Sequence, residues 1–231
     1  MKPAANEARE NAQARGDMYR FLSIVYLHPP QPGFVRHITS SEVLTELSSL
    51  FGARAVAPLR AFAATAGADG DVESLKQEYM DLFAVPTGRY VTPFEDVYRG
   101  ITVEGTQERG PLLGERAIAV KRMYRLAGAE LDRDCRELPT HVGVQLSFMS
   151  FLCERQAVAI AEEEGNGVRD RERPAYEGSI WYRELQARFL REHLGVWVPQ
   201  LRRAIETKAR SDFYRGLALV TEEFLVKEAH S

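Results

Sequence analysis

Apolar residues recur at helical spacing through most of the chain. Near the amino terminus Met18, Phe21, Leu22 and Val25 fall at i, i+3, i+4 and i+7, which places them on one face of a helix. The His-Pro-Pro sequence that begins at His28 interrupts this pattern, because proline cannot continue the helical hydrogen bonds. The pattern predicts a first helix that this sequence stops.

Three more helices are predicted before residue 84. Thr39 and Glu42 stand at capping-box spacing and predict the start of the second helix. The third spans about residues 52–67 and must begin or kink at Pro58. Asp71 is the expected cap of the fourth. The apolar stripe of this fourth helix is formed by Val72, Leu75, Tyr79, Leu82 and Phe83.

The helical pattern disappears between residues 84 and 114. This segment contains three prolines and five glycines, which predicts a long irregular excursion with at most a short turn. Loops of this length in compact domains are usually functional or disordered. The aromatic residues Tyr90, Phe94 and Tyr98 favour an ordered loop, because their side chains need a surface to pack against.

The second half of the chain returns to helices. The pattern from residue 115 ends at Gly128, the expected C-terminal cap. Pro139 is expected to open a long helix that is apolar around much of its circumference and therefore central and buried. Residues 165–179 are predicted to form a solvated connection, and three helices, separated by Gly195 with Pro199 and by Ser211, complete the chain. With about eight helices and no strand, the expected fold is all-α, either one domain or two packed lobes.

Composition narrows the function classes. The 231 residues are 45% hydrophobic and 27% charged, as in soluble globular proteins, and the net charge of -3 gives no reason to expect nucleic-acid binding. Cys135 and Cys153 are expected to be free thiols, because two cysteines are too few for a disulfide scaffold. No apolar stretch has the length of a signal peptide or of a membrane span, so we expect a cytoplasmic protein without membrane insertion.

Sequence motifs for catalysis are missing. The chain has no phosphate-binding loop, no G-x-G-x-x-G sequence and no serine in a nucleophile elbow. None of its histidines lies three or four residues from another histidine or a cysteine, the spacing of helical metal ligands. The sequence therefore predicts no catalytic residue, no metal and no cofactor, and we expect that the protein is not an enzyme.

Three motifs in fixed order carry a family resemblance. They are "EYMDLFAVPTGRYVTPFEDVY", "ELPTHVGVQLSFMSFL" and "FLREHLGVWVPQL", between Glu78 and Leu201. The chain resembles the TorD/DmsD/NarJ family of redox-enzyme maturation proteins, which are cytoplasmic chaperones for molybdenum oxidoreductases. That family usually shows Y/W-x-x-L-F, then P-P-x-E-S-V-Y, then P-D-H-[IL]-x-x-E-L-x-F, then F-x-x-x-H-L-x-x-W-x-P.

The resemblance implies a fold and a function. It implies a TorD-like helical domain over residues 1–231, with lobes at about 1–135 and 142–231 joined by a hinge at about 136–141. It implies that the protein binds the twin-arginine signal peptide and the immature catalytic subunit of a molybdenum oxidoreductase, without breaking any bond. We expect a monomer, with a domain-swapped dimer through residues 165–179 as the alternative. The candidate peptide-binding residues are Tyr79, Leu82, Phe83, Pro93, Phe94, Glu95, Tyr98, Thr140 and His141.

The candidate residues have different expected roles. An apolar groove would take the signal segment, and its candidates are Tyr79, Phe83, Phe94 and Tyr98, of which the last two are expected to be exposed in the loop. Glu95, Asp96 and Glu137 would form an acidic rim for the arginines. Tyr79, Leu82 and Phe83 are also at core spacing. His141 and Thr140 fit an ordinary helix start as well as a peptide-binding hinge. His193 and Trp197 are expected to pack the turn between two helices, and Pro93 and Glu95 also fit a role in shaping the loop.

Two departures from the family pattern concern acidic positions. Thr140 stands where the family commonly has aspartate, and Gln145 stands where it often has glutamate. Both departures remove a carboxylate, which implies a divergent client if those acids grip the peptide. Two other functions stay open, a helical adaptor for another partner and a weak guanine-nucleotide-binding protein, although the latter would lack a phosphate loop.

Overall fold

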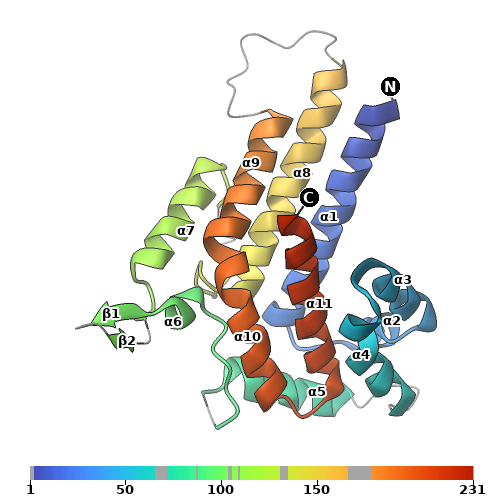
Figure 1. Cartoon of the computed structure of the whole chain (residues 1–231), viewed down its shortest axis with the longest axis vertical. Helices are drawn as coiled ribbons and strands as arrows, with labels where there is room; N and C mark the ends of the chain where they lie inside the picture. Colours follow the sequence, from blue (N-terminus) through green and yellow to red (C-terminus); the bar gives the residue numbers. More distant parts are fainter. Residues whose placement is uncertain are drawn as a thin grey trace.

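The computed structural model describes residues 3–65, 72–86, 88–103, 106–108, 110–130, 135–165 and 178–230. Its helices contain nearly all of the regular structure (Figure 1). The first half contains α1 (Pro3–Leu27), α2 (Pro32–Ile38), α3 (Ser41–Phe51), α4 (Ala53–Thr65), α5 (Val72–Tyr79), the π-helical turn η1 (Met80–Ala84) and α6 (Glu95–Arg99). The second half contains α7 (Glu115–Leu126), α8 (Val142–Gly165), α9 (Ser179–Phe189), the π-helical turn η3 (Leu190–Leu194), α10 (Gly195–Lys208) and α11 (Asp212–Ala229).

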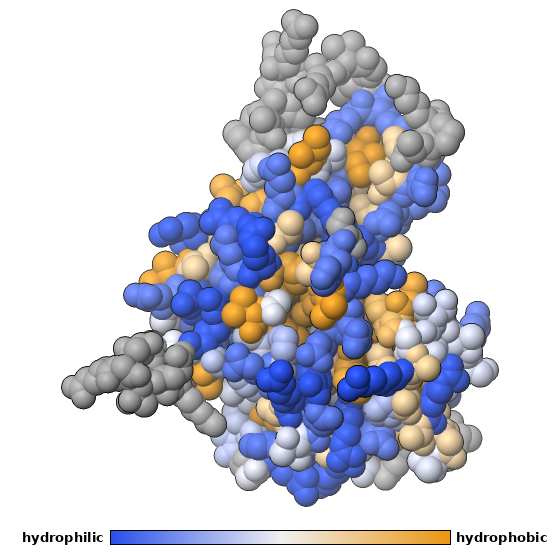
Figure 2. All heavy atoms as spheres, in the orientation of Figure 1, coloured by the Kyte–Doolittle hydropathy of each residue, from blue (hydrophilic) through white to orange (hydrophobic). Residues whose placement is uncertain are grey.

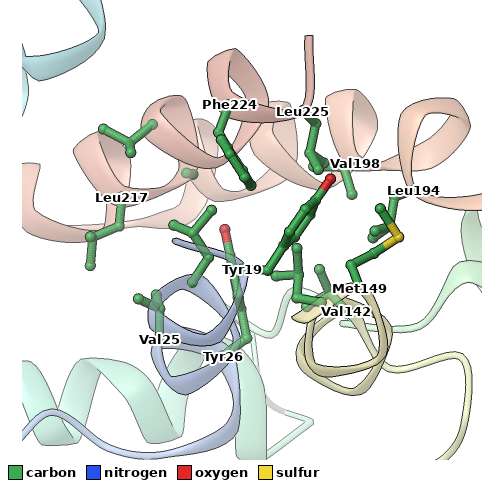
Figure 3. Packing of buried hydrophobic residues seen from close by; sticks show 14 of the residues in the cluster. Tyr19, Val25, Tyr26, Val142, Met149, Leu194, Val198, Leu217, Phe224 and Leu225 are labelled. Atoms are coloured by element: carbon green, nitrogen blue, oxygen red, sulfur yellow. The ribbon is translucent and has the colours of Figure 1, made fainter. Parts of the chain in front are cut away.

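The long helices form a bundle around α8. Figure 1 shows α1, α8, α9 and α11 side by side, with α2, α3 and α4 packed at one end and α7 on the opposite flank. The most extensive helix packing joins α1 to α8, and α11 packs on α4 and α10. Figure 3 shows the core at this centre, where Tyr19 of α1 lies between Met149 of α8 and Phe224 of α11. The all-α prediction is confirmed.

The core is continuous across the predicted hinge. One cluster of buried apolar residues contains side chains from α1 and α5 as well as from α8, α10 and α11. The first helix crosses the boundary most directly, since Ser150 of α8 donates a hydrogen bond of 2.8 Å to the carbonyl of Gly16 in α1. The division into two lobes joined at residues 136–141 therefore stays a prediction.

Several predicted helix ends are confirmed and others are wrong. Helix α1 ends at Leu27, directly before the His-Pro-Pro sequence, and Gly128 follows α7 with φ at +69°. The cap of α3 is Ser40, whose hydroxyl accepts from the Val43 amide; the Thr39 hydroxyl instead donates to the Val35 carbonyl, so the Thr39 cap was wrong. Pro58 lies inside α4 and does not begin it. The predicted Asp71 cap lies outside the described residues.

The expected break at Gly195 and Pro199 does not occur. Helices α9 and α10 continue into each other through the π-helical turn η3, and Pro199 lies within α10. A π turn absorbs one additional residue without ending the helix. A Cβ atom at Gly195 would lie 2.9 Å from the Leu190 carbonyl oxygen, so only glycine fits inside this turn.

The segment 84–114 is more ordered than predicted. It contains the short helix α6 and an antiparallel pair of strands, β1 (Ile101–Val103) and β2 (Thr106–Glu108), so the prediction of no strand was wrong. Three-residue strands are too short to show a periodic pattern in the sequence. Residues 166–177 of the predicted connection lie outside the described part of the chain. No helix in the described part is long and apolar enough to cross a membrane.

Candidate functional site

The three sequence motifs meet at one buried junction. The loop before α6 runs antiparallel to the segment before α8, with Phe94 paired to His141 as an isolated β-bridge. Two backbone hydrogen bonds hold the segments together: the Glu95 amide donates to the Thr140 carbonyl at 3.0 Å, and the Val142 amide donates to the Pro93 carbonyl at 2.8 Å. The third motif arrives from η3 and α10. We call this meeting point, formed by residues 93–99, 139–145 and 192–197, the junction.

Glu95 is the centre of the junction. Its carboxylate is 0% exposed and lies 3.0 Å from His193 Nδ1 through both of its oxygens. Gln145 Nε2 donates to Glu95 Oε2 at 2.5 Å, and an Arg99 guanidinium nitrogen donates to Glu95 Oε1 at 2.9 Å. The Glu95 carboxylate thus joins α6, α8 and η3, and it accepts hydrogen bonds from all three.

The surrounding donors keep Glu95 ionised. Burial alone raises the pKa of a carboxyl group, but the hydrogen bond and charge of His193, with the bonds from Arg99 and Gln145, hold the pKa of Glu95 below its usual value. Because an ionised carboxylate only accepts, His193 must carry its proton on Nδ1. Trp197 Nε1 donates to Gln145 Oε1 at 3.1 Å, which extends the network into α10. Buried networks of this kind fix relative positions when each member is satisfied.

A second carboxylate joins the loop to the start of α8. The Thr140 hydroxyl donates to Asp96 Oδ2 at 2.6 Å, and both residues are buried. The family pattern has serine at the position of Asp96 and aspartate at the position of Thr140. In this chain the same two positions hold a carboxylate and a hydroxyl, and the two groups are in contact. The departure at Thr140 is compensated within the junction, because a carboxylate is still present there.

His141 caps helix α8. Its Nδ1 accepts a hydrogen bond of 3.1 Å from the Gly143 amide, and its carbonyl accepts from the Gln145 amide, so the helix begins at Val142 and not at Pro139. The ring packs edge-on against Phe94, with 5.4 Å between ring centroids. Burial lowers the pKa of His141 to about 3. The imidazole is therefore neutral at physiological pH and acts as a cap.

This cap makes folding sensitive to acid. Between the usual histidine pKa of about 6.5 and the folded value of about 3, the unfolded chain binds a proton that the folded chain does not. Stability therefore falls as the pH falls through this window, by up to about 1.4 kcal/mol per pH unit. His141→Asn keeps a capping oxygen but does not titrate, so its urea midpoint should vary less between pH 7 and pH 5 than that of the wild type. An equal change of the urea midpoint between pH 7 and pH 5 in both proteins would contradict the assignment of His141 as the titrating cap.

The predicted site residues fall into two groups. Tyr79, Leu82 and Phe83 belong to the hydrophobic core: the Tyr79 hydroxyl donates to the Tyr26 carbonyl at 3.0 Å, and the Phe83 ring packs on Tyr26. The other group is the junction, which contains Pro93, Phe94, Glu95, Tyr98, Thr140 and His141.

Two expectations about these residues were wrong. Phe94 and Tyr98 are half-buried, and the Tyr98 ring stacks on Trp197 with 5.4 Å between centroids, so neither is an exposed loop aromatic. Glu95 and Asp96 lie inside the junction and not on an acidic rim, because donors from α8 and η3 hold the Glu95 carboxylate and the Thr140 hydroxyl, just before α8, holds that of Asp96. Of the three acids expected at the rim, Glu137 alone is exposed, at 44% of its side chain.

A groove opens beside the junction. It has a volume of about 650 Å³ and lies between the end of α1, the end of α7 and the first turns of α8. Its apolar walls are formed by Leu27, Tyr124, Val144, Phe148 and Phe151. Its polar edge is formed by His28, Glu130, Arg136, Glu137 and Ser147. A volume of this size, apolar inside and polar at the edge, is typical of ligand-binding clefts.

The junction positions one wall of this groove. The hydroxyl of Tyr124 donates to the Pro139 carbonyl at 2.9 Å, and its ring lies 4.4 Å from that of Phe148. His141 then starts α8, so that Val144 and Ser147 face the groove. None of these wall residues was predicted from the sequence to bind a peptide. The available signal was Ser147, a polar residue between Leu146 and Phe148 in a mostly apolar stretch.

Other kinds of site are not found in the described residues. No group of three or more histidine, cysteine, aspartate or glutamate side chains in the described ranges could hold a metal ion. Cys153 is buried, and burial raises the pKa of its thiol to about 12, so it is protonated and unreactive. The Glu95–His193 pair is enclosed by protein and out of reach of a substrate.

Comparisons with known proteins agree with this geometry. A family described as "Nitrate reductase delta subunit" matches residues 51–203, which include the junction and the groove-lining part of α8. The chain belongs to the nitrate reductase delta subunit family. The resemblance to redox-enzyme maturation proteins, which rested on three short motifs, is thereby confirmed.

Three relatives bear names that describe assembly functions. A perchlorate reductase assembly chaperone protein of Dechloromonas aromatica (strain RCB) is 28% identical over 60% of this chain and 53% of its own length. A selenate reductase assembly chaperone protein of Thauera selenatis is 29% identical over 64% of this chain and 65% of its own length. A chlorate reductase assembly chaperone protein of Ideonella dechloratans is 29% identical, with 58% of each chain covered. The chain thus spans between about half and two thirds of these relatives.

Proposed function

We propose that this protein is a cytoplasmic assembly chaperone for the catalytic subunit of a molybdenum oxidoreductase. The observation that carries the proposal is the groove beside the junction, whose walls are apolar and whose edge presents Glu130 and Glu137. The family membership and the names of the relatives support an assembly role. In this proposal the protein works as a monomer and holds its client until the molybdenum cofactor has been inserted.

The groove suits a twin-arginine signal peptide. Such a peptide combines two arginines with a moderately apolar segment that can become helical, and an apolar groove takes one face of a helix. Phe148, Phe151 and Val144 would contact the apolar segment. Glu137 and Glu130 would pair with the arginines, since guanidinium groups form strong bonds to carboxylates. The junction residues would contribute indirectly, because they fix the helix start that forms the groove wall.

Calorimetric titration with a signal peptide tests this proposal. The probe is a synthetic twin-arginine signal peptide, with two arginines followed by a moderately apolar segment, and the protein is the full chain. We expect Ser147→Trp to weaken binding at least tenfold, on the order of 1.4 kcal/mol, because the indole fills the groove. Ser147 is exposed, so this change does not disturb the core.

Helix α8 offers a matched control. Val158 is also exposed and lies on the same face of α8, three turns beyond Ser147 and away from the groove. Val158→Trp should bind the peptide as the wild type does. Glu137→Gln, and replacement of both peptide arginines by lysine, should each weaken binding. If the wild-type chain does not bind the peptide, or if Ser147→Trp binds it normally, the proposal is wrong.

A further inference from the structure

The outward face of α7 exposes apolar side chains. Ile118 and Leu126 are 55% and 52% exposed, and Leu112 and Leu113, just before the helix, are exposed to a similar degree. These four are among the twelve exposed large apolar residues in the described part of the chain, and they lie within 15 consecutive positions. Single exposed apolar residues are ordinary, but a group of them marks an interaction surface.

The same face is basic. Helix α7 carries Arg116, Lys121, Arg122 and Arg125 against one acid, Glu115, in a chain whose net charge is -3. Arg125 donates to a backbone carbonyl, and no carboxylate of the described residues pairs with any of the four cations. Figure 2 shows strongly hydrophilic and apolar residues interspersed on the flank where α7 lies. Cations that stabilise a helix through its dipole lie in the last turn. Arg125 is the basic residue in the last turn of α7, so the dipole does not account for the other three.

From this arrangement we propose that the outward face of α7 docks an acidic amphipathic segment of a protein partner. Ile118, Arg122 and Leu126 are spaced four residues apart and form one stripe, with Lys121 and Arg125 beside it. An acidic helix with leucines at helical spacing matches this stripe, since its carboxylates meet Arg122 and Arg125 while its leucines cover Ile118 and Leu126. The buried face of α7, by contrast, contains Tyr124 and Met123 and packs inward.

The position of Arg122 favours a protein partner over a lipid surface. A helix that inserts into a bilayer surface keeps its cations beside the apolar face. Here Arg122 lies between Ile118 and Leu126 in the middle of that face. Its guanidinium would have to enter the apolar layer, whereas a carboxylate of a protein segment would neutralise it.

Fluorescence anisotropy with a defined peptide tests the proposal. The probe is a labelled synthetic helix of glutamate with leucine at helical spacing, and its control peptide has lysine in place of glutamate. We expect the full chain to bind the glutamate peptide, more weakly as salt is added, and not to bind the lysine peptide. Arg122→Glu with Arg125→Glu should weaken binding at least tenfold, and Ile118→Ser should weaken it several-fold.

Matched variants separate this surface from the groove. Arg54→Glu with Arg203→Glu reverses two exposed arginines elsewhere and should leave the affinity for the glutamate peptide unchanged. Val158→Ser is the control for Ile118→Ser, and Ser147→Trp should not affect this peptide although it blocks the groove. The proposal is overturned if the Arg122 and Arg125 variant binds normally, if the lysine peptide binds equally, or if the chain binds vesicles of anionic phosphatidylglycerol and not the peptide.

Discussion

Glu95→Ala should be the most destabilising single change at the junction. It removes the acceptor of three donors, from His193, Gln145 and Arg99. The donors of His193 and Gln145 are buried and lose this partner, whereas Arg99 keeps its hydrogen bond to the Glu192 carbonyl. Breaking a buried charged pair by removing one member typically costs about 3–5 kcal/mol. The unfolding temperature should fall by on the order of 10 °C.

Urea and thermal denaturation measure this effect. The control is Glu184→Ala, which removes an exposed glutamate from α9 and should change the stability by less than about 0.5 kcal/mol. A Glu95→Ala protein as stable as this control would show that the junction does not hold α6, α8 and η3 together. If Glu95→Ala also weakens peptide binding, its effect on the groove is indirect, because Glu95 does not line the groove.

The buried contact between Asp96 and Thr140 predicts a second large effect. Thr140→Asp alone places two buried carboxylates in contact, and both cannot remain ionised there, so we expect a loss of about 3 kcal/mol or more at neutral pH. Asp96→Ser alone keeps a hydroxyl pair and should cost about 1 kcal/mol. The double variant restores one carboxylate and one hydroxyl, now in exchanged positions. It should be more stable than the sum of the single changes predicts, with a coupling energy of about 2 kcal/mol.

A double-mutant cycle by urea denaturation measures this coupling. The singles and the double are compared at pH 7, and Thr140→Asp is also measured at lower pH. The difference in unfolding free energy between the wild type and Thr140→Asp should become smaller as the pH is lowered, because a shared proton relieves the repulsion between the two carboxylates. Additive losses in the double variant would show that Asp96 and Thr140 are not coupled through their hydrogen bond.

The helices of the core could be predicted because their buried residues recur at the helical period of the sequence. The stripe formed by Val72, Leu75 and Tyr79 predicted α5, and each of these side chains is buried. The ends of the helices were less predictable, because the position of a helix cap depends on a single hydrogen bond. Ser40 and Thr39 have the same capping chemistry, and only the chain direction decides which hydroxyl reaches the Val43 amide. The π turn at η3 has no periodic signal, so the Gly195 break was predicted wrongly.

The sequence singled out some of the residues that meet at the junction, but not their geometry. The order of the motifs singled out Glu95, Thr140 and His141, and these residues do lie together. The sequence could not show that Glu95 faces Gln145 and His193, because those contacts span 50 and 98 positions. An acidic residue in a polar loop is usually exposed, whereas Glu95 is buried because donors from distant parts of the chain bind its carboxylate. The groove was missed because its walls come from α1, α7 and α8, and no local pattern combines them.

The central claim is that the groove holds the apolar segment of a signal peptide. Photo-crosslinking tests it most directly, with a twin-arginine peptide that carries a photoreactive phenylalanine in its apolar segment and with mass-spectrometric mapping on the full chain. We expect crosslinks on the groove walls, at Val144, Phe148 and Phe151 of α8 and at Tyr124 of α7, and their loss in Ser147→Trp. Crosslinks confined to other surfaces, or unchanged by Ser147→Trp, would contradict it.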